Sequence, residues 1–301
     1  MRNRDTTRSR PGRILKLALL NAATTISRMA YFRGRDRLTR LLFQLASLQG
    51  NCRVVVEGFN FDLNLTDGVA QHLFLHRSFP GLISQKLRSF IHTGMTVVDI
   101  GANIGYVTMT CAQCVGPSGR VIAFEPAPRA FASLRENLKL NELYWVEAEP
   151  LACGDSEGTA LLHLATISDE YNSLAVSDRC VHDSSVSCRI VSLDEYAARK
   201  RLDHIDVVKI DVEGAEWSVL KGMRRILTSK QPPLLVVEAS ARNAAPFHYT
   251  PADMFTWLAD FGYAFHIISE AGAKEYSPQL ISEYDRVTDV VCLPPGTVFS
   301  A

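Results

Sequence analysis

The run V-V-D-I-G-A-N-I-G-Y at residues 97–106 restricts the fold of this chain more than any other stretch of its sequence. Apolar, strand-forming residues pass directly into a turn that contains Gly101 and Gly105. Glycine allows the backbone to bend tightly and to approach a ligand without an intervening side chain. In doubly wound α/β folds, ligands bind outside the carboxyl ends of the parallel strands, where the strand order reverses. The run therefore predicts such a sheet, with a ligand-binding loop after its first strand.

The rest of the sequence supports this sheet, because apolar strand-like runs alternate with helical segments along the main part of the chain. Parallel strands that are buried on both faces are typically continuous apolar runs, as R-V-I-A-F and L-L-V-V-E are here. We expect strands at residues 96–100, 120–125, 146–153, 205–211, 234–238, 263–268 and 287–293.

Two segments fall outside this alternation. Residues 1–93 are predicted to form a basic N-terminal extension of helices and a β-hairpin, since the apolar residues up to position 48 have helical spacing and those after Glu57-Gly58 alternate with polar ones. Residues 94–301 are then the main domain. Within it, residues 155–192 are rich in Ser, Asp and Thr, and we expect them to form an inserted hairpin over the carboxyl ends of the strands.

The charge of the chain is zero overall but unevenly distributed. Thirty-two Lys and Arg residues balance thirty-two Asp and Glu residues, yet residues 1–40 carry eleven basic residues against Asp5 and Asp36. This distribution argues against a main domain that binds nucleic acid. It is compatible with peripheral contact between the basic N-terminus and an anionic membrane surface or an acidic partner. The apolar stretch at residues 14–26 is too short and too polar to span a bilayer.

The cysteines bear on the compartment. Seven cysteines without regular spacing do not resemble the disulfide framework of a small secreted protein, so we expect a reduced, cytoplasmic environment. Cys111 and Cys114 form the only close pair and fall in the middle of a predicted helix. They lack the helix N-terminus that lowers a thiol pKa, and we expect them to be inert packing residues.

An acidic residue stands at the end of the second predicted strand. Glu125 follows Gly105 by twenty residues, and a carboxylate at this place and spacing can accept hydrogen bonds from a ribose diol. Asn103 tolerates turn conformations and can hydrogen-bond a ligand, and Ala102 is nearly as small as glycine. Loop and acid together predict a site for a nucleoside-type cofactor.

The sequence of the loop distinguishes between such cofactors. A dinucleotide-binding loop reads G-x-G-x-x-G and binds a pyrophosphate with backbone N–H groups at a helix N-terminus. This loop instead reads D-x-G-x-x-x-G, with Asp99 at its entrance. A carboxylate disfavours a neighbouring pyrophosphate and favours the cationic methionine part of S-adenosylmethionine (SAM). We therefore expect SAM, with a nicotinamide-dependent oxidoreductase on a similar Rossmann sheet as the alternative.

The motifs of the main domain, in their order and spacing, resemble those of the FkbM methyltransferase family. The resemblance covers about residues 96–238. It implies a class I, Rossmann-like methyltransferase fold with a doubly wound, mostly parallel seven-stranded sheet. It also implies SAM-dependent methylation of a hydroxyl group on a small-molecule natural product or a glycan. The matching motifs are V-V-D-I-G-A-N-I-G-Y (97–106), A-F-E-P-A-P (123–128), A-C-G-D (152–155), V-S-L-D-E-Y (191–196) and V-K-I-D-V-E-G-A-E (208–216).

The resemblance assigns roles to single residues as well. It places Asp211 and Glu213 at the carboxyl end of the fourth strand, facing the methyl group and its acceptor. Glu125 would hold the ribose, and Asp155 would lie near the adenine. The SAM loop itself would consist of Asp99, Gly101, Asn103 and Gly105.

An alcohol acceptor has to lose its proton, either to a positioned base or with the help of a metal ion. We expect Asp211 to be this base because it ends a strand beside the expected methyl position, and Glu213 and Glu238 are the next candidates. Three carboxylates at adjacent strand ends can also bind a divalent cation such as Mg²⁺, although we do not expect a required metal. Lys209 lies inside the strand, and we expect it to be salt-bridged or to snorkel.

Two short segments depart from the family pattern. Residues 171–174 read Y-N-S-L where the family often has a Gly-Ser-Ser-like turn. Residues 238–240 read Glu-Ala-Ser where the family often has Glu, Ile or Val, and His. Both segments fall where we expect the acceptor to bind, so the resemblance does not identify the acceptor. A non-catalytic SAM-binding module is the alternative from another functional class, and the acidic set at the strand ends favours catalysis over it.

Overall fold

A computed structural model of the protein divides into two compact units, residues 1–79 and residues 80–301. We predict the boundary between residues 93 and 94, and the division of the structure falls earlier because α4 (Ile83–Phe90) packs against α5 (Tyr106–Val115) of the second unit. The structure describes residues 10–27, 29, 34–46, 51–78, 83–165, 168–176, 181–269, 272–282 and 288–297.

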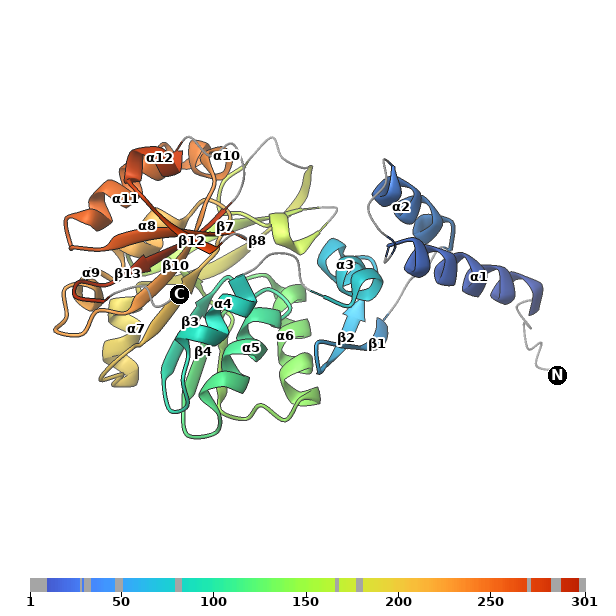
Figure 1. The fold of residues 1–301 in the computed structure, drawn as a ribbon, viewed down its shortest axis with the longest axis horizontal. Coiled ribbons are helices and arrows are strands. Elements are labelled where there is room, and N and C mark those ends of the chain that lie inside the picture. Colours follow the sequence, from blue (N-terminus) through green and yellow to red (C-terminus); the bar gives the residue numbers. More distant parts are fainter. Residues whose placement is uncertain are drawn as a thin grey trace. The chain divides into compact units, whose positions relative to one another are not determined.

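The first unit consists of helices and one hairpin (Figure 1). Its antiparallel hairpin turns at Glu57 and Gly58, whose φ angles of 48° and 89° suit the tight turns that match strand twist. Asp67 caps the following helix by accepting a hydrogen bond from the Ala70 amide. No helix among the described residues is long and apolar enough to cross a membrane. The elements of this unit are α1 (Arg10–Ser27), α2 (Arg35–Ala46), β1 (Asn51–Val56), β2 (Phe59–Asn64) and α3 (Gly68–His76).

The second unit is built on a mixed, mainly parallel sheet with the strand order β12-β11-β13-β10-β9-β3-β4-β5. From β3 the chain proceeds through β4 to β5, and it then returns to the other side of β3 to form β9 and β10. The strand order therefore reverses between β3 and β9, which is where ligands bind in doubly wound sheets. The strands are β3 (Thr96–Ile100), β4 (Arg120–Phe124), β5 (Val146–Glu149), β9 (Val207–Ile210), β10 (Leu234–Ala239), β11 (Ala264–Ser269), β12 (Gly272–Tyr276) and β13 (Thr288–Leu293).

The predicted Rossmann-like, doubly wound sheet is confirmed. Seven of its strands correspond to the predicted ones, and β13 among them is antiparallel to its neighbours β10 and β11. β12 extends the edge as an eighth strand and is antiparallel to β11. One boundary differs: the strand predicted at residues 146–153 ends at Glu149, and residues 152–153 pair with a different sheet. Pro150 explains the break, because proline has no N–H to donate to a strand ladder.

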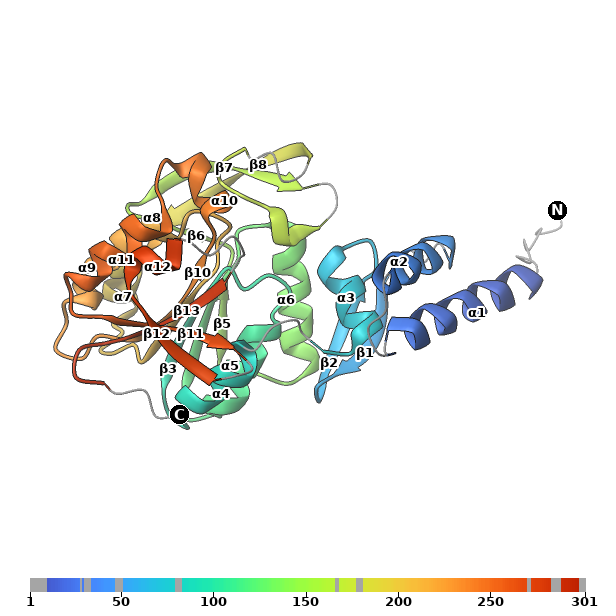
Figure 2. The same ribbon diagram turned by 45° about the horizontal axis from the view of Figure 1, so that its top comes forward.

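Helices cover both faces of this sheet (Figure 2). One face carries α4, α5 and α6, and the opposite face packs its apolar residues against α7, α8, α9 and α11. The central strands β3, β4, β9 and β10 are almost entirely buried, which explains their continuous apolar sequences. The helices not yet given are α6 (Pro128–Leu140), α7 (Leu193–Lys200), α8 (Glu216–Lys221), α9 (Arg224–Leu227), α10 (Ala241–Ala244), α11 (Pro251–Ala259) and α12 (Pro278–Ser282), with a 3₁₀ turn η2 (Ala245–Phe247).

Residues 152–191 contain a small second sheet with the order β6-β8-β7. Its two long strands pair as an antiparallel hairpin, and a 3₁₀ turn follows the first of them. The hairpin packs through Leu162 and Cys188 against Ala127 and Ala130 at the start of α6. The elements are β6 (Ala152–Cys153), β7 (Gly158–Ala165), η1 (Asp169–Tyr171) and β8 (His182–Val191).

Candidate active site

The glycine loop after β3 requires its glycines for steric reasons. Gly101 and Gly105 have φ angles of +83° and +95°, a region that disfavours residues with a side chain. A Cβ atom on Gly101 would lie 1.8 Å from the carbonyl oxygen of Asp211, and one on Gly105 would lie 2.6 Å from Leu134. The loop therefore packs directly against the end of β9, so the cofactor loop and the predicted base are in contact through their backbones.

The side chain of Asp99 lies in the protein interior, not at the solvent-exposed surface of the glycine loop. Its carboxylate is fully buried, and Oδ2 accepts a 2.6 Å hydrogen bond from the Thr108 hydroxyl. Oδ1 lies 3.7 Å from the Lys209 ammonium. Burial raises the pKa of Asp99, and the adjacent Lys209 opposes that rise. The contacts of Asp99 thus indicate that it supports the loop from within the protein.

Lys209 joins the two strand ends at the reversal point. Its side chain is 6% exposed, and Nζ lies 3.0 Å from Oδ2 of Asp211 and donates to the Gly101 carbonyl oxygen at 3.3 Å. Burial lowers the pKa of Lys209, but Asp211 and Asp99 raise it by more, so its pKa lies above the ordinary value. The expectation of a salt-bridged lysine is confirmed, and this cation holds Asp99, Gly101 and Asp211 together.

Glu125 closes the other side of the loop. Its carboxylate is buried and accepts hydrogen bonds from the backbone amides of Asn103 and Ala127, each at 2.8 Å. Burial raises the pKa of Glu125 to about 7, although the two backbone bonds oppose the shift. Asn103 has a φ of +49° and its side chain bonds the Ile104 amide at 2.7 Å. Ala102 is buried between these residues.

Three carboxylates form a cluster, here called the acid cluster, at the ends of β9 and β10. Asp211, Glu213 and Glu238 each offer one oxygen, and these atoms lie within 4.8 Å of one another. The Asn243 side-chain amide donates to Oε2 of Glu213 at 2.8 Å and to Oε2 of Glu238 at 2.9 Å. Burial raises the pKa of Glu238 well above its ordinary value, and Asp211 and Glu213 raise it further. The cluster therefore contains at least one carboxyl group, that of Glu238, that favours its protonated form.

Glu213 adopts an unusual backbone conformation with a φ of +54°. Strained conformations of this kind are typical of functional sites, where the surrounding structure holds them in place. Glu216 holds the same loop, because its buried carboxylate accepts from the Val212 amide at 3.1 Å and from the Gly214 amide at 3.0 Å. Tyr249 donates to the second oxygen of Glu216 at 2.9 Å.

The conformation of Glu213 leads to a prediction about stability. Glu213→Gly should have a free energy of unfolding about 1 kcal/mol larger than Glu213→Ala, because only glycine adopts this φ without steric cost. At ordinary positions the order is reversed, since alanine restricts the unfolded chain. Urea unfolding of the two variants measures the difference. Equal stability, or a more stable alanine variant, would show that the loop relaxes and that Glu213 carries no strain.

Asp155 follows the short strand β6 of the second sheet. Its side chain is 52% exposed and its Oδ2 lies 3.5 Å from the Lys221 ammonium at the end of α8. The interruption at Pro150 carries the residues that follow it into the second sheet. The contact between Asp155 and adenine that the resemblance implies stays a prediction.

Other candidates lie outside the acid cluster. His163 of β7 and His182 of β8 face each other across the inserted hairpin with ring centroids 6.0 Å apart. Cys111 is fully buried, which raises its thiol pKa well above the ordinary value, as expected for an inert cysteine. Asn243 is the site residue that the sequence does not reveal. Its position depends on α10 folding back over the strand ends, which no local pattern encodes.

Known proteins resemble this chain in the region that contains the glycine loop and the acid cluster. The model of the family described as the methyltransferase FkbM domain matches residues 99–265, more than half of the chain. The 2-O-methyltransferase NoeI of Sinorhizobium fredii is 27% identical over 198 residues, which cover 61% of this chain and 74% of NoeI. Methyltransferase sdnD of Sordaria araneosa is 34% identical over 157 residues, which cover 42% of this chain and 60% of sdnD.

A third relative is the hexuronic acid methyltransferase AglP of Haloferax volcanii. It is 32% identical over 133 residues, which cover 44% of this chain and 51% of AglP. The chain thus spans less than two thirds of the length of two of these three relatives. The matched region contains the glycine loop, Glu125 and the acid cluster.

Proposed function

This chain belongs to the FkbM methyltransferase family, and we propose that it transfers a methyl group from SAM to a hydroxyl group of a small molecule or glycan. One observation carries the proposal: the glycine loop, which is typical of a nucleoside site, packs directly on Asp211 of the acid cluster. A methyl donor in the loop would therefore lie beside groups that can accept a proton. The relative named as a 2-O-methyltransferase supports transfer to oxygen, and the one named as a hexuronic acid methyltransferase supports a sugar-like acceptor.

The protein contributes mainly alignment to such a reaction. Methyl transfer from a sulfonium is an in-line displacement, in which the acceptor oxygen forms a bond to the methyl carbon while the carbon–sulfur bond breaks. Gly101 and Gly105 let the backbone approach SAM, and Glu125 accepts hydrogen bonds from the ribose. Bound SAM supplies the methyl group, and the products are the methylated acceptor and S-adenosylhomocysteine.

The acceptor proton has to leave as the new bond forms. Asp211 is 35% exposed and Lys209 holds one of its oxygens, so the carboxylate is oriented and reachable from solvent. We assign the proton to Asp211, which can then release it to water. Glu213 and Glu238, fixed by Asn243, are assigned to hydrogen bonds with the acceptor.

The same three oxygens fit a hard divalent cation, which prefers carboxylate ligands. When bound, such an ion would acidify the acceptor hydroxyl. Our proposal needs no metal, because Lys209 already supplies a fixed positive charge beside Asp211. Activity that survives exhaustive treatment with a chelator agrees with this assignment, whereas activity restored only by Mg²⁺ or a similar ion contradicts it.

The raised pKa of Glu125 predicts a pH dependence of cofactor binding. An ionised carboxylate accepts hydrogen bonds from a ribose diol better than its protonated form, so SAM affinity should rise with pH. With a pKa of about 7, the increase between pH 6 and pH 8 should be about tenfold. Calorimetry at several pH values measures it, and Glu125→Gln should bind weakly with little pH dependence. An equally steep rise in the Gln variant would assign the titration to another group.

The same shift affects stability without cofactor. Folding raises the pKa of Glu125 from 4.5 to about 7, so the folded protein holds this proton more tightly. The contribution of Glu125 to the free energy of unfolding therefore falls as the pH rises through this window.

The working environment is also part of the proposal. We place the enzyme in the cytoplasm, since the described cysteines are free and most of them are buried thiols. The basic N-terminal region adds the possibility of peripheral contact with an anionic membrane surface.

The reaction itself can be tested with SAM labelled in its methyl group. The protein is incubated with labelled SAM and with fractionated hydroxylated metabolites and oligosaccharides, and the products are identified by mass spectrometry. We expect label on an acceptor oxygen together with S-adenosylhomocysteine. Label found only on nitrogen would replace the hydroxyl assignment, and SAM binding without transfer to any fraction would favour a binding module.

A further inference from the structure

Residues 168–174, between β7 and β8, contact both sides of the candidate active site. We call this segment the bridge. Its sequence, S-D-E-Y-N-S-L, includes the Y-N-S-L segment that departs from the family pattern. One end of the bridge is bonded to Arg129 on the cofactor side, and the other is bonded to Glu213 in the acid cluster.

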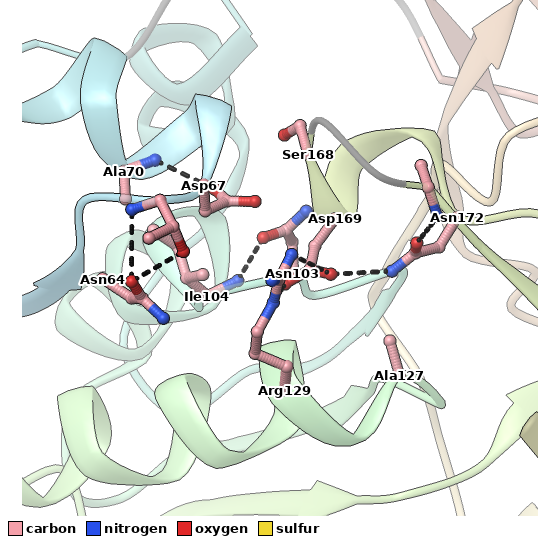
Figure 3. Close-up of polar contacts among 12 residues, drawn as sticks. Asn64, Asp67, Ala70, Asn103, Ile104, Ala127, Arg129, Ser168, Asp169 and Asn172 are labelled. Atoms are coloured by element: carbon pink, nitrogen blue, oxygen red, sulfur yellow. Dashed lines mark hydrogen bonds and ion pairs between the residues drawn. The ribbon is translucent and has the colours of Figure 1, made fainter. Parts of the chain in front are cut away.

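The cofactor end of the bridge is a two-bond ion pair. The Arg129 guanidinium donates to both oxygens of Asp169, from Nε at 2.8 Å and from Nη2 at 2.9 Å (Figure 3). The Asp169 side chain is 7% exposed, whereas that of Arg129 is 45% exposed. Bidentate pairs of this kind fix geometry as well as charge. Arg129 follows Glu125, the acid proposed to bind the ribose and here called the ribose acid, by four residues. The negative charge of Asp169 helps to raise the pKa of Glu125, so this end of the bridge interacts electrostatically with the ribose acid.

The middle of the bridge is fixed by its own hydrogen bonds. The Asn172 amide donates to Oδ1 of Asp169 at 3.1 Å, and its oxygen accepts from the Ala165 amide at 2.8 Å (Figure 3). Ser173 pairs with His163 of β7 through two backbone hydrogen bonds of 2.8 and 3.1 Å. Leu174 packs on the apolar cluster that also contains Ala127 of the cofactor side. Displacement of Asp169 would therefore be transmitted to Ser173.

The acceptor end of the bridge holds the backbone of Glu213. The buried Ser173 hydroxyl donates to the Glu213 carbonyl oxygen at 2.9 Å. Glu213 is also the residue with the left-handed backbone, and its carboxylate is bonded by Asn243. Ser173 thus fixes the main chain of Glu213, and Asn243 orients its side chain.

We propose that the bridge positions Glu213 for methyl transfer by tying residues 211–214 to the cofactor side of the site, with Arg129 and Ser173 as positioning residues at its two ends. The inference rests on the proposed function, because Glu213 is assigned there to the acceptor. It also assigns residues 171–174 a role in acceptor specificity, because they belong to the segment that links Arg129 to Glu213 of the acid cluster.

Hydrogen–deuterium exchange tests whether Arg129 restrains the backbone of residues 211–214 through the bridge, and it does not require activity. Arg129→Met should accelerate exchange in a peptide covering residues 211–216, which lie at the other end of the bridge. Loss of hydrogen bonds at the usual net value predicts an increase of about 2–12-fold. Arg129→Lys, which keeps the charge but not the two-bond geometry, should give a smaller increase. Arg225→Met removes an exposed arginine that pairs with Glu195 and is the matched control, with no change expected in this peptide.

Turnover provides the second readout, in the form of a double-mutant cycle. Ser173→Ala should lower kcat about 2–12-fold and leave SAM affinity unchanged, and Ser173→Thr, which keeps a hydroxyl, should restore part of it. Independent substitutions normally have additive free energies, so their rate effects multiply. If the bridge acts as one unit, Arg129→Met combined with Ser173→Ala should be no slower than the slower single variant.

Each outcome decides the inference. Faster exchange confined to residues 168–176 in Arg129→Met, with residues 211–216 unchanged, would show that the ion pair acts only locally. If the rate of the double variant is lowered by the product of the two single effects, Arg129 and Ser173 act independently and the bridge does not act as one unit. If the wild-type protein methylates nothing, the proposed function fails, and the exchange measurement alone still supports or overturns the bridge.

Discussion

Asp211→Asn should lower turnover by about 10²–10⁴-fold, the usual contribution of a positioned base. The amide keeps the size and shape of the side chain but cannot accept the acceptor proton. Affinity for SAM should change far less, because the glycine loop and Glu125, which we propose to bind the ribose, are intact. Measuring kcat and SAM affinity on the same folded variant separates these effects.

The matched control for this variant is Asp260→Asn, since Asp260 is an exposed acid at the end of α11. It should have wild-type turnover. Near-normal turnover of Asp211→Asn would remove Asp211 from the catalytic residues. Loss of SAM binding with normal turnover at saturating SAM would assign Asp211 to the cofactor instead.

Lys209→Met should be the most destabilising substitution at this site, lowering the free energy of unfolding by about 3–5 kcal/mol, as expected when one partner of a buried ion pair is removed. The methionine leaves the fully buried carboxylate of Asp99 without its cation. Because Asp99 can relieve this cost by taking up a proton, the loss should shrink as the pH falls. Urea unfolding at several pH values measures both effects.

Two further variants sharpen this measurement. Lys221→Met removes a half-exposed lysine paired with Asp155 and should change stability by no more than about 0.5 kcal/mol. Combining Lys209→Met with Asp99→Asn should recover part of the loss, since the buried charge is then absent. A loss for Lys209→Met as small as that for Lys221→Met would mean that Lys209 does not hold the two strand ends together.

The sheet and its glycine loop follow from the sequence because their causes are local. Continuous apolar runs encode buried parallel strands, and the tight approach of Gly101 to Asp211 requires a residue without a side chain. The strand predicted at residues 146–153 is too long, because Pro150 has no N–H to donate to the strand ladder and the strand ends at Glu149. The edge strand β12 was not predicted.

The acid cluster was predictable in part. Asp211 follows β9, Glu238 lies near the carboxyl end of β10, and these parallel strands are neighbours in the sheet, so the two acids come together at one edge. Which side chains fix them was not predictable, because Asn243 and Ser173 reach Glu213 from elements 30 and 40 residues away. The inward direction of Asp99 likewise depends on Thr108 and Lys209, which no motif spacing identifies as its partners.

The most direct test of the account is a calorimetric titration of the wild-type protein with SAM and, separately, with NAD, repeated on Glu125→Ala. We predict binding of SAM at one site and no binding of NAD. In the folded Glu125→Ala variant, the loss of ribose hydrogen bonds to a charged acceptor, at about 1.5–3 kcal/mol each, should weaken SAM binding at least tenfold. Binding of NAD in place of SAM, or SAM affinity that is unchanged by Glu125→Ala, would contradict the account.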